Sequence, residues 1–437
     1  MNDLWLSLPA FAQDLLILVA LLLPAILTGA VLCAGFAPGP LVRAMIGRFR
    51  WVSLAFVLLI AVSVGMGTGL TSQERSLRTG LAAAADKFDI IVARPGSEIT
   101  ALLAAVYLQP SDIGLIGGEA YDRVATHPRA EIAAPLAFGD SFRGAPIVGT
   151  TEDFALYLAD GALAEGRMWQ DVPEALAGAR SGLSVGDIVV PSHGHGAAAD
   201  SEAHAGVEIV VTGLLPPSGS PWDTAILVPV EQVWETHGLV NGHAIGETHL
   251  GPPFDPESFP GTPAIVVHAA DLASAYGLRQ TFDNQDDTMA FFPGAVLTRL
   301  YAIMGDVRRA MSLMAVTTQA LVAASILLGL FILSRLFRRQ VALLRALGAP
   351  SRFILAVVWC FGAALILAGA LIGLALGVAA AQVLSAIVAA RTDVAMAAGI
   401  GWPELHLVAG FLSLVSLVAL LPAWAVLRQP VAASLRG

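Results

Sequence analysis

Long apolar runs alternate with polar segments along this chain. A helix needs about 20 residues to cross the ~30 Å hydrocarbon core of a membrane. Five runs reach that length and predict five spanning helices: Leu15–Gly35, Trp51–Leu70, Met311–Leu333, Leu355 to about Ala390, and Leu405–Leu427. Because Asp3 and Asp14 precede the first run in place of the basic residues of a signal peptide, we expect a retained helix there.

The segment Thr71–Gly305, between the second and third runs, has a mixed composition. Short β-branched runs predict strands at Phe88–Arg94, Glu208–Leu215, Thr224–Pro229 and Ala264–Ala269. Helical spacing predicts helices at Ile99–Leu108 and Ala273–Phe282. We therefore expect a polytopic α-helical membrane protein with a large mixed α/β domain inserted between its second and third spanning helices.

The predicted organisation has four parts. They are an extra N-terminal helix (1–40), an amphipathic segment with the first core helix (41–70), the α/β domain (71–305), and a three-helix domain (306–437) that includes a short cytoplasmic helix at 336–352. Composition agrees with a membrane protein, since 56% of the 437 residues are hydrophobic, 13% are charged and the mean hydropathy is +0.73.

Charge predicts the sidedness of these parts, because basic residues near helix ends mark the cytoplasmic side. Arg43, Arg48 and Arg50 lie between the first two runs, which places that loop inside and the large domain outside. The domain has 29 acidic and 11 basic residues, so it offers no basic patch for nucleic acid. The short basic segment Leu336–Phe353 then falls inside again.

This basic segment reads LFRRQVALLRALGAPSRF and contains four arginines. Val341, Leu344 and Leu347 share one side of a short helix, which can lie at the membrane interface or in the groove of a partner. Gly348 predicts the end of that helix, and Pro350 predicts the start of the next. Plain anchoring by positive charge is the alternative interpretation, but it does not explain the Leu-Arg-Ala-Leu-Gly order.

Small residues recur at four-residue spacing in two of the predicted spans. Gly369, Gly373 and Gly377 lie in one span, and Gly65 and Gly69 lie in another. Such stripes allow close helix packing. Generic packing and a moving helix interface need the same residues, so the sequence leaves both open.

A histidine-containing loop, PSHGHGAAADSEAHAG, interrupts the strand pattern of the domain. Its candidate metal ligands are His193, His195 and His204. Neutral imidazole suits zinc or copper, but this spacing matches no defined zinc motif. A solvated polar loop and weak, flexible metal capture both remain open.

Motifs of enzymes are missing from the sequence. It contains no G-x-S-x-G and no H-E-x-x-H, and Lys87 is the only lysine, without the glycines and hydroxyl residue of a phosphate-binding loop. The chain is therefore expected to bind no cofactor directly. If ATP drives it, a separate subunit must supply the nucleotide site.

These features resemble the FtsX-like permease family, the membrane subunits of ABC transporters of the macrolide-exporter and lipoprotein-extraction type. The similarity covers Leu41–Gly437 and is most specific in RRQVALLRALGA. The family pattern has glutamate where this chain has Gln340. The tail matches through Arg428, Pro430 and Arg436, and the extra N-terminal helix departs from the four-span core. A subgroup with a histidine-bearing outer loop, linked to metal uptake, is also similar.

The resemblance implies a homodimeric permease in the bacterial inner membrane, with an ABC ATPase dimer on its cytoplasmic face and a periplasmic or lipoprotein partner outside. The residues that it assigns to ATPase coupling are Arg338, Arg339, Gln340, Leu343, Leu344, Arg345, Ala346, Leu347 and Gly348. Its function would be mechanotransmission, with zinc handling as one form. The alternative is a signalling scaffold that activates a periplasmic enzyme such as a cell-wall hydrolase, without transport.

Overall fold

The computed structural model describes residues 5, 7–109, 111–193, 206–283, 285–302 and 338–427, and isolated positions between 313 and 331. The chain divides into two compact units. The helical unit contains Met1–Leu77, Asp306–Ala386 and Ala397–Gly437. The α/β unit contains Arg78–Gly305 and Ile387–Met396.

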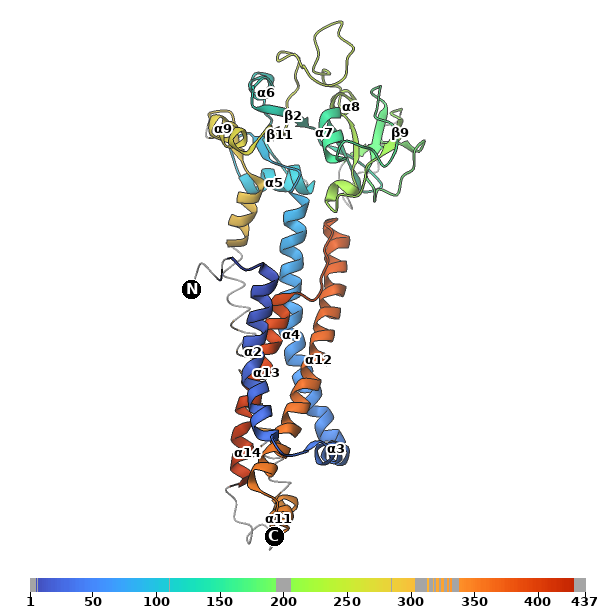
Figure 1. Cartoon of the computed structure of the whole chain (residues 1–437). Helices are drawn as coiled ribbons and strands as arrows, with labels where there is room; N and C mark the ends of the chain where they lie inside the picture. Colours follow the sequence, from blue (N-terminus) through green and yellow to red (C-terminus); the bar gives the residue numbers. More distant parts are fainter. Residues whose placement is uncertain are drawn as a thin grey trace. The chain divides into compact units, whose positions relative to one another are not determined.

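Long apolar helices dominate the helical unit (Figure 1). Its described helices are α2 (Ala10–Cys33), α3 (Gly39–Arg48), α4 (Arg50–Ala84), α11 (Arg338–Ala346), α12 (Ser351–Thr392), α13 (Trp402–Val418) and α14 (Leu420–Leu427), of which α4 and α12 end in the α/β unit. Within the described residues, four helices are long and apolar enough to cross a membrane: α2, α4, α12 and the stretch Trp402–Trp424. The chain is a membrane protein. The span expected at Met311–Leu333 lies mostly outside the described residues and stays a prediction.

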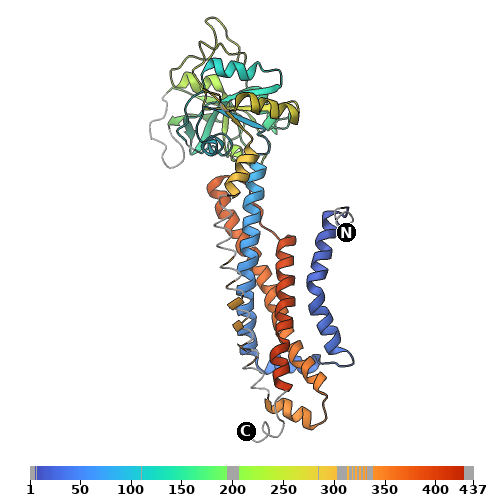
Figure 2. The ribbon, with the colours of Figure 1, turned by 90° about the vertical axis from the view of Figure 1, so that its left-hand side faces the viewer.

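Glycines bring α4 and α12 into close backbone contact, and the two helices run side by side in both views (Figure 2). A Cβ atom on Gly65 would lie 3.1 Å from the carbonyl oxygen of Gly373, and one on Gly69 would lie 3.0 Å from that of Gly377. In the other direction, a Cβ on Gly373 would lie 2.7 Å from the carbonyl oxygen of Ala61. The two predicted glycine stripes therefore face each other.

An ion pair with a buried carboxylate fixes the start of α13 within the helical unit. Glu404 has no exposed side-chain surface, and its Oε2 lies 3.2 Å from Nη2 of Arg75 on α4. The same oxygen accepts a hydrogen bond of 2.7 Å from the backbone N–H of Gly401, which closes a cap on the first turn. Arg75 also donates to the carbonyl oxygen of Gly399 at 2.6 Å.

The first sheet of the α/β unit is antiparallel, with strand order β12-β1-β11-β2. Its strands are β1 (Ile90–Ala93), β2 (Ala130–Leu136), β11 (Ala264–Ala269) and β12 (Met289–Phe291). Helices α5 (Glu98–Tyr107), α6 (Gly118–Ala125) and α9 (Leu272–Phe282) accompany it. The strands expected around residues 90 and 265 and the helices expected around 103 and 278 are confirmed.

The second sheet is mixed, since β4 pairs with β10, and β6 with β9, in parallel. Its order is β5-β9-β6-β10-β4-β3-β8, and β7 also pairs with β9. The strands are β3 (Asp140–Phe142), β4 (Ala145–Thr150), β5 (Glu165–Gly166), β6 (Glu174–Ala177), β7 (Ile188–Val189), β8 (Ser192–His193), β9 (Ile209–Leu214) and β10 (Ile226–Pro229). Helices α7 (Glu152–Leu158) and α8 (Val230–Thr236) and the 3-10 turn η2 (Pro221–Asp223) complete the unit. The expected strands at β9 and β10 are confirmed.

Two buried apolar clusters stabilise this unit. Phe88, Phe154 and Trp222 contact one another in the first cluster. Trp234 and Phe254 belong to the second, where their rings meet edge to face with centroids 5.5 Å apart. The second cluster lies against α8, whose two ends carry the polar groups considered next.

Candidate functional site

A buried carboxylate and two histidines meet where β3, β8 and the end of α8 come together. Antiparallel pairing of β3 with β8 sets Asp140 opposite His193. Oδ1 of Asp140 lies 3.3 Å from Nδ1 of His193 and 3.6 Å from Nε2 of His237. The Asp140 side chain is 3% exposed, whereas that of His193 is 49% exposed. The carboxylate of the cluster is therefore buried, while the His193 imidazole is accessible to solvent.

The tautomer of His237 suits a metal ligand. Its Nδ1 lies 2.8 Å from the carbonyl oxygen of Val233, one turn earlier in α8, and donates to it. The lone pair is then on Nε2, which faces Asp140. Donation of the second ring N–H to a carbonyl group is the usual support of a metal-bound histidine. Two imidazoles and one carboxylate form a donor set that fits Zn²⁺.

The cluster overlaps the sequence prediction at one position. His193 is one of the three predicted ligands, while His195 and His204 lie outside the described residues. Asp140 and His237 were not predicted, because they are 53 residues before and 44 residues after His193 in the chain. No spacing rule connects such distant positions. Their candidate ligand atoms lie within 4.8 Å of one another in the fold.

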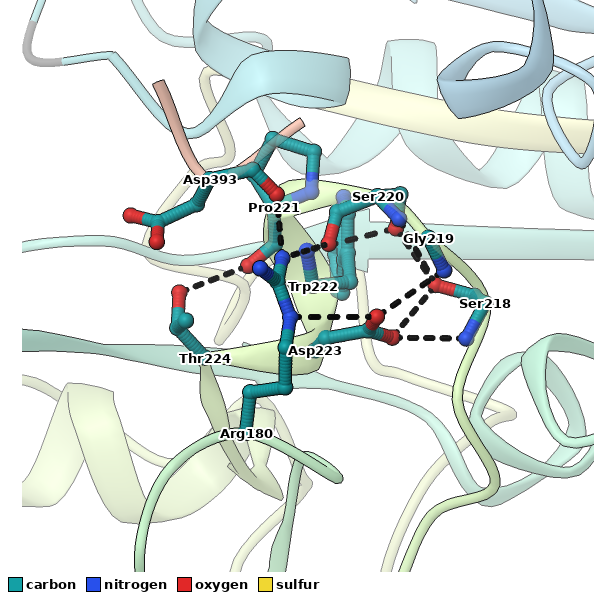
Figure 3. Close-up of polar contacts among 9 residues, drawn as sticks. All are labelled: Arg180, Ser218, Gly219, Ser220, Pro221, Trp222, Asp223, Thr224 and Asp393. Carbon is teal, nitrogen blue, oxygen red and sulfur yellow. Dashed lines mark hydrogen bonds and ion pairs between the residues drawn. The ribbon is translucent and has the colours of Figure 1, made fainter. Parts of the chain in front are cut away.

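A second polar cluster lies around η2 and includes the chain segment that follows α12 (Figure 3). The buried Asp223 carboxylate accepts hydrogen bonds from the N–H groups of Ser218 at 2.7 Å and Gly219 at 2.9 Å. Nε of Arg180 lies 3.5 Å from Oδ2 of Asp223. Nη2 of Arg180 donates to the carbonyl oxygens of Ser220 and Asp393.

This cluster holds residues 393–395 against the η2 loop. The N–H of Ala395 donates to the carbonyl oxygen of Gly219 at 2.9 Å. Burial raises the pKa of the Asp393 carboxyl above its ordinary value, and Arg180 offsets part of that shift. Sequence reasoning missed Arg180, although a basic residue in a strongly acidic domain was a usable signal.

The predicted coupling segment forms α11 and ends where Gly348 predicted. The N–H of Ala349 donates to the carbonyl oxygen of Leu344 at 2.9 Å, and that of Gly348 donates to Arg345 at 3.0 Å. Gly348 has a φ of +91°, which completes a Schellman cap. Two residues, Ala349 and Pro350, then separate this cap from α12.

The exposed apolar pair of this segment is Leu343 and Leu347, which are 50% and 84% exposed. They are four residues apart, and the N–H of Leu347, the residue directly after α11, donates to the carbonyl oxygen of Leu343 at 3.0 Å, so the two side chains lie on the same side. Leu344 is half-buried instead, so it contributes less to that face than the sequence pattern predicted.

The other predicted coupling positions add little to this picture. Arg338, Arg339 and Gln340 form the first turn of α11. Ala346 is exposed near the end of this helix. The predicted tail residues Arg428, Pro430 and Arg436 lie outside the described residues.

Comparison with known proteins assigns the C-terminal part of the chain. Residues 312–431 match the family described as FtsX-like permease C-terminal. No curated protein matches the chain. A crystal structure of the periplasmic region of MacB from Actinobacillus actinomycetemcomitans is similar over 49% of this chain and 95% of its own, with 10% identity and a TM-score of 0.31. That TM-score is too low to establish a common fold.

Proposed function

The chain is an FtsX-like permease by its C-terminal domain, and we propose that it transmits conformational change from a separate ABC ATPase subunit to its α/β unit. A permease of this family is the membrane subunit of an ABC transporter. Mechanotransmission requires a path from the cytoplasmic docking segment to the α/β unit. The described residues provide such a path along one continuous stretch of chain.

The observation that carries the proposal is the continuity of α11, α12 and Asp393. The cap of α11 joins α12 through Ala349 and Pro350. Helix α12 then runs without a break to Thr392, and its residues from Ile387 onward belong to the α/β unit. Asp393 follows immediately and is bound by Arg180. A displacement of α11 can therefore reach the α/β unit through hydrogen-bonded backbone.

Helix α4 supports the same proposal, since it also contributes residues to both units. Its residues up to Leu77 belong to the helical unit, and those from Arg78 belong to the α/β unit. The glycine contacts couple residues 57–69 of α4 to residues 369–377 of α12. We expect two copies of the chain and two ATPase subunits in the working assembly, in the bacterial inner membrane with the α/β unit outside.

The docking step is tested with charges on the exposed face of α11. Vanadate-sensitive ATP hydrolysis should co-purify with the wild-type chain. The double variant Leu343→Glu and Leu347→Glu should insert into the membrane normally and lose this co-purifying activity. Val185→Glu, at a 40% exposed apolar position of the α/β unit, is the matched control. Unchanged co-purifying hydrolysis in the double variant would exclude α11 as the docking segment.

Metal handling is the form of this function that the Asp140 cluster favours. We propose that Asp140, His193 and His237 bind Zn²⁺ on the α/β unit. In full-length chain, His193→Ala with His237→Ala should weaken zinc binding at least 10-fold, measured by titration after chelator treatment. Asp140 would hold the ion, and the two rings would supply nitrogen donors. Unchanged affinity would remove this cluster from consideration without affecting the docking proposal.

A signalling scaffold would use the same path from α11 to Asp393. It would need no metal ligands, whereas the Asp140 cluster combines two imidazoles with a carboxylate in one place. This observation favours metal handling over the scaffold. Zinc-dependent stimulation of the co-purifying ATP hydrolysis would distinguish them, because a scaffold that acts through a protein partner has no reason to respond to zinc.

A further inference from the structure

The loop after α8 contains a histidine whose two ring nitrogens have very different surroundings. His243 is buried, with 1% of its side chain exposed, and its Nε2 lies 3.2 Å from Oε1 of Glu231. Its Nδ1 is also buried and has no hydrogen-bond partner among the described residues. An unsatisfied buried polar atom lowers the stability of the fold, so its presence calls for a physical reason.

Glu231 fixes the tautomer of this ring. The carboxylate is 2% exposed and also accepts the N–H of Gly251 at 2.6 Å. An ionised carboxylate can only accept, so Nε2 of His243 carries the proton that it donates. The neutral ring then presents its lone pair at Nδ1. A proton on Nδ1 would not satisfy this atom, because it would create a buried N–H donor that has no acceptor among the described residues.

Two further side chains with possible ligand atoms, Glu247 and His249, lie near this ring. The rings of His243 and His249 meet at a centroid distance of 4.3 Å. Nε2 of His249 lies 3.2 Å from the carbonyl oxygen of Pro253 and donates to it, which leaves the lone pair on its Nδ1. Candidate ligand atoms of His243, Glu247 and His249 lie within 4.8 Å of one another.

The local backbone builds this arrangement. Gly242 has a φ of +83°, and a Cβ atom there would lie 2.7 Å from the Trp234 ring and 3.0 Å from the Phe254 ring. A glycine is therefore required for the loop to pass over these two rings and insert the next side chain, His243. The position of the buried imidazole is set by packing and by Glu231, independently of Glu247 and His249.

We propose that His243, Glu247 and His249 bind a Zn²⁺ ion and that Glu231 orients His243 as a positioning residue. Two imidazole nitrogens and one carboxylate are zinc ligands, with bonds of about 2.0–2.2 Å. Each ring donates its second N–H to an oxygen acceptor, as metal-bound histidines do. The exposed Glu247 and His249 can close on the ion by rotating their side chains, while His243 is already fixed.

This site is separate from the Asp140 cluster and does not depend on the proposed transport function. The two clusters share no ligand, although both use α8: Glu231 lies in its first turn and His237 follows its last. The ion would tie the loop that contains residues 243–249 to α8. The site would therefore bind zinc whether or not an ATPase subunit is present.

The test uses full-length chain in detergent, in a background where His193, His195, His204 and His237 are all alanine. After chelator treatment, titration with Zn²⁺ should show about one strong site per chain, and Co²⁺ should give visible d–d absorption. Glu247→Gln with His249→Ala should weaken binding at least 10-fold. These two side chains are exposed, so the fold should persist. The matched control is His127→Ala, at a histidine outside both clusters.

The positioning role has its own readout. Glu231→Gln should lower zinc affinity about 10–100-fold, as loss of an outer-shell partner does elsewhere, and should alter the Co²⁺ spectrum while stoichiometry at saturation stays the same. The proposed site would be overturned if neither variant changed zinc affinity, that is, neither Glu247→Gln with His249→Ala nor Glu231→Gln. That result would indicate that a water molecule satisfies Nδ1 of His243. ATPase docking through α11 would be unaffected by that result.

Discussion

Nη2 of Arg180 donates a hydrogen bond to the backbone carbonyl oxygen of Asp393, the first residue after α12. The same guanidinium lies 3.5 Å from the buried carboxylate of Asp223. One side chain therefore joins the end of a membrane helix to the η2 loop. In the proposed mechanism this is the point where movement of α12 reaches the η2 loop.

Replacing Arg180 should weaken the attachment of Asp393 to the η2 loop without unfolding the α/β unit. Arg180→Ala removes the donor to Asp393, while Asp223 keeps its bonds to Ser218 and Gly219. We expect a loss of about 1–2 kcal/mol in unfolding free energy. Amide exchange over residues 387–396 should accelerate, measured by mass spectrometry on full-length chain. Arg143→Ala is the control. Equal exchange rates in both variants would contradict the proposal that Arg180 attaches Asp393 to the η2 loop.

The glycine contact between α4 and α12 predicts a strong size limit. A Cβ on Gly373 would lie 2.7 Å from the carbonyl oxygen of Ala61 and 2.8 Å from Cβ of Val64. Gly373→Ala should therefore destabilise the chain by about 1–3 kcal/mol through overpacking. The measurement is the midpoint of thermal denaturation in detergent.

The control for this prediction is Gly47→Ala in α3, where no atom lies within 4 Å of the added Cβ. This variant should be neutral or slightly stabilising, because alanine favours helix more than glycine does. A midpoint for Gly373→Ala that matches the Gly47→Ala value would show that the two long helices are not in close contact.

The local parts of this fold were predictable because their causes are local. The end of α11 at Gly348 follows from one residue that tolerates a φ of +91°. The strand β11 follows from a run of β-branched residues. The histidine-carboxylate clusters were not predictable in this way, since Asp140 reaches His193 only through pairing of β3 with β8. His193 could be singled out by composition, but its neighbours depend on tertiary structure.

Residues whose role depends on contacts from elsewhere in the chain were harder still to recognise. Glu231 looks like an ordinary polar position in a helix, and its function becomes visible only when Gly251 and His243 converge on its carboxylate. The sequence pattern predicted that Leu344 lies with Leu347 on the exposed side of the short helix, but in the structure the exposed pair is Leu343 and Leu347. The orientation of a short helix depends on what it packs against.

The ion pair between the buried Glu404 and the partly exposed Arg75 predicts graded losses of stability. Glu404→Ala removes the carboxylate partner of Arg75 and the acceptor for the N–H of Gly401, so unfolding should become easier by about 1.5–3 kcal/mol. Glu404→Gln keeps an amide oxygen for Gly401 and should lose less. Denaturation midpoints of the two variants in detergent check this order. Equal losses would show that the cap contributes nothing and that the charge alone matters.

Acid pH should act on the α/β unit through Glu174. The guanidinium of Arg167 and the N–H of Gln170 hold the pKa of this carboxyl below its ordinary value. Because the folded pKa is lower than the unfolded one, Glu174 stabilises the fold above its unfolded pKa of about 4.3, and the contribution is lost as pH falls through the folded pKa. Glu174→Gln should therefore lower the denaturation midpoint at pH 7, and the difference in midpoint from wild type should narrow towards pH 3.

Glu257→Gln, at an exposed position, is the control and should show no such difference in midpoint. A gap for Glu174→Gln that stays constant between pH 7 and pH 3 would mean that the ion pair is not the source of the stabilisation.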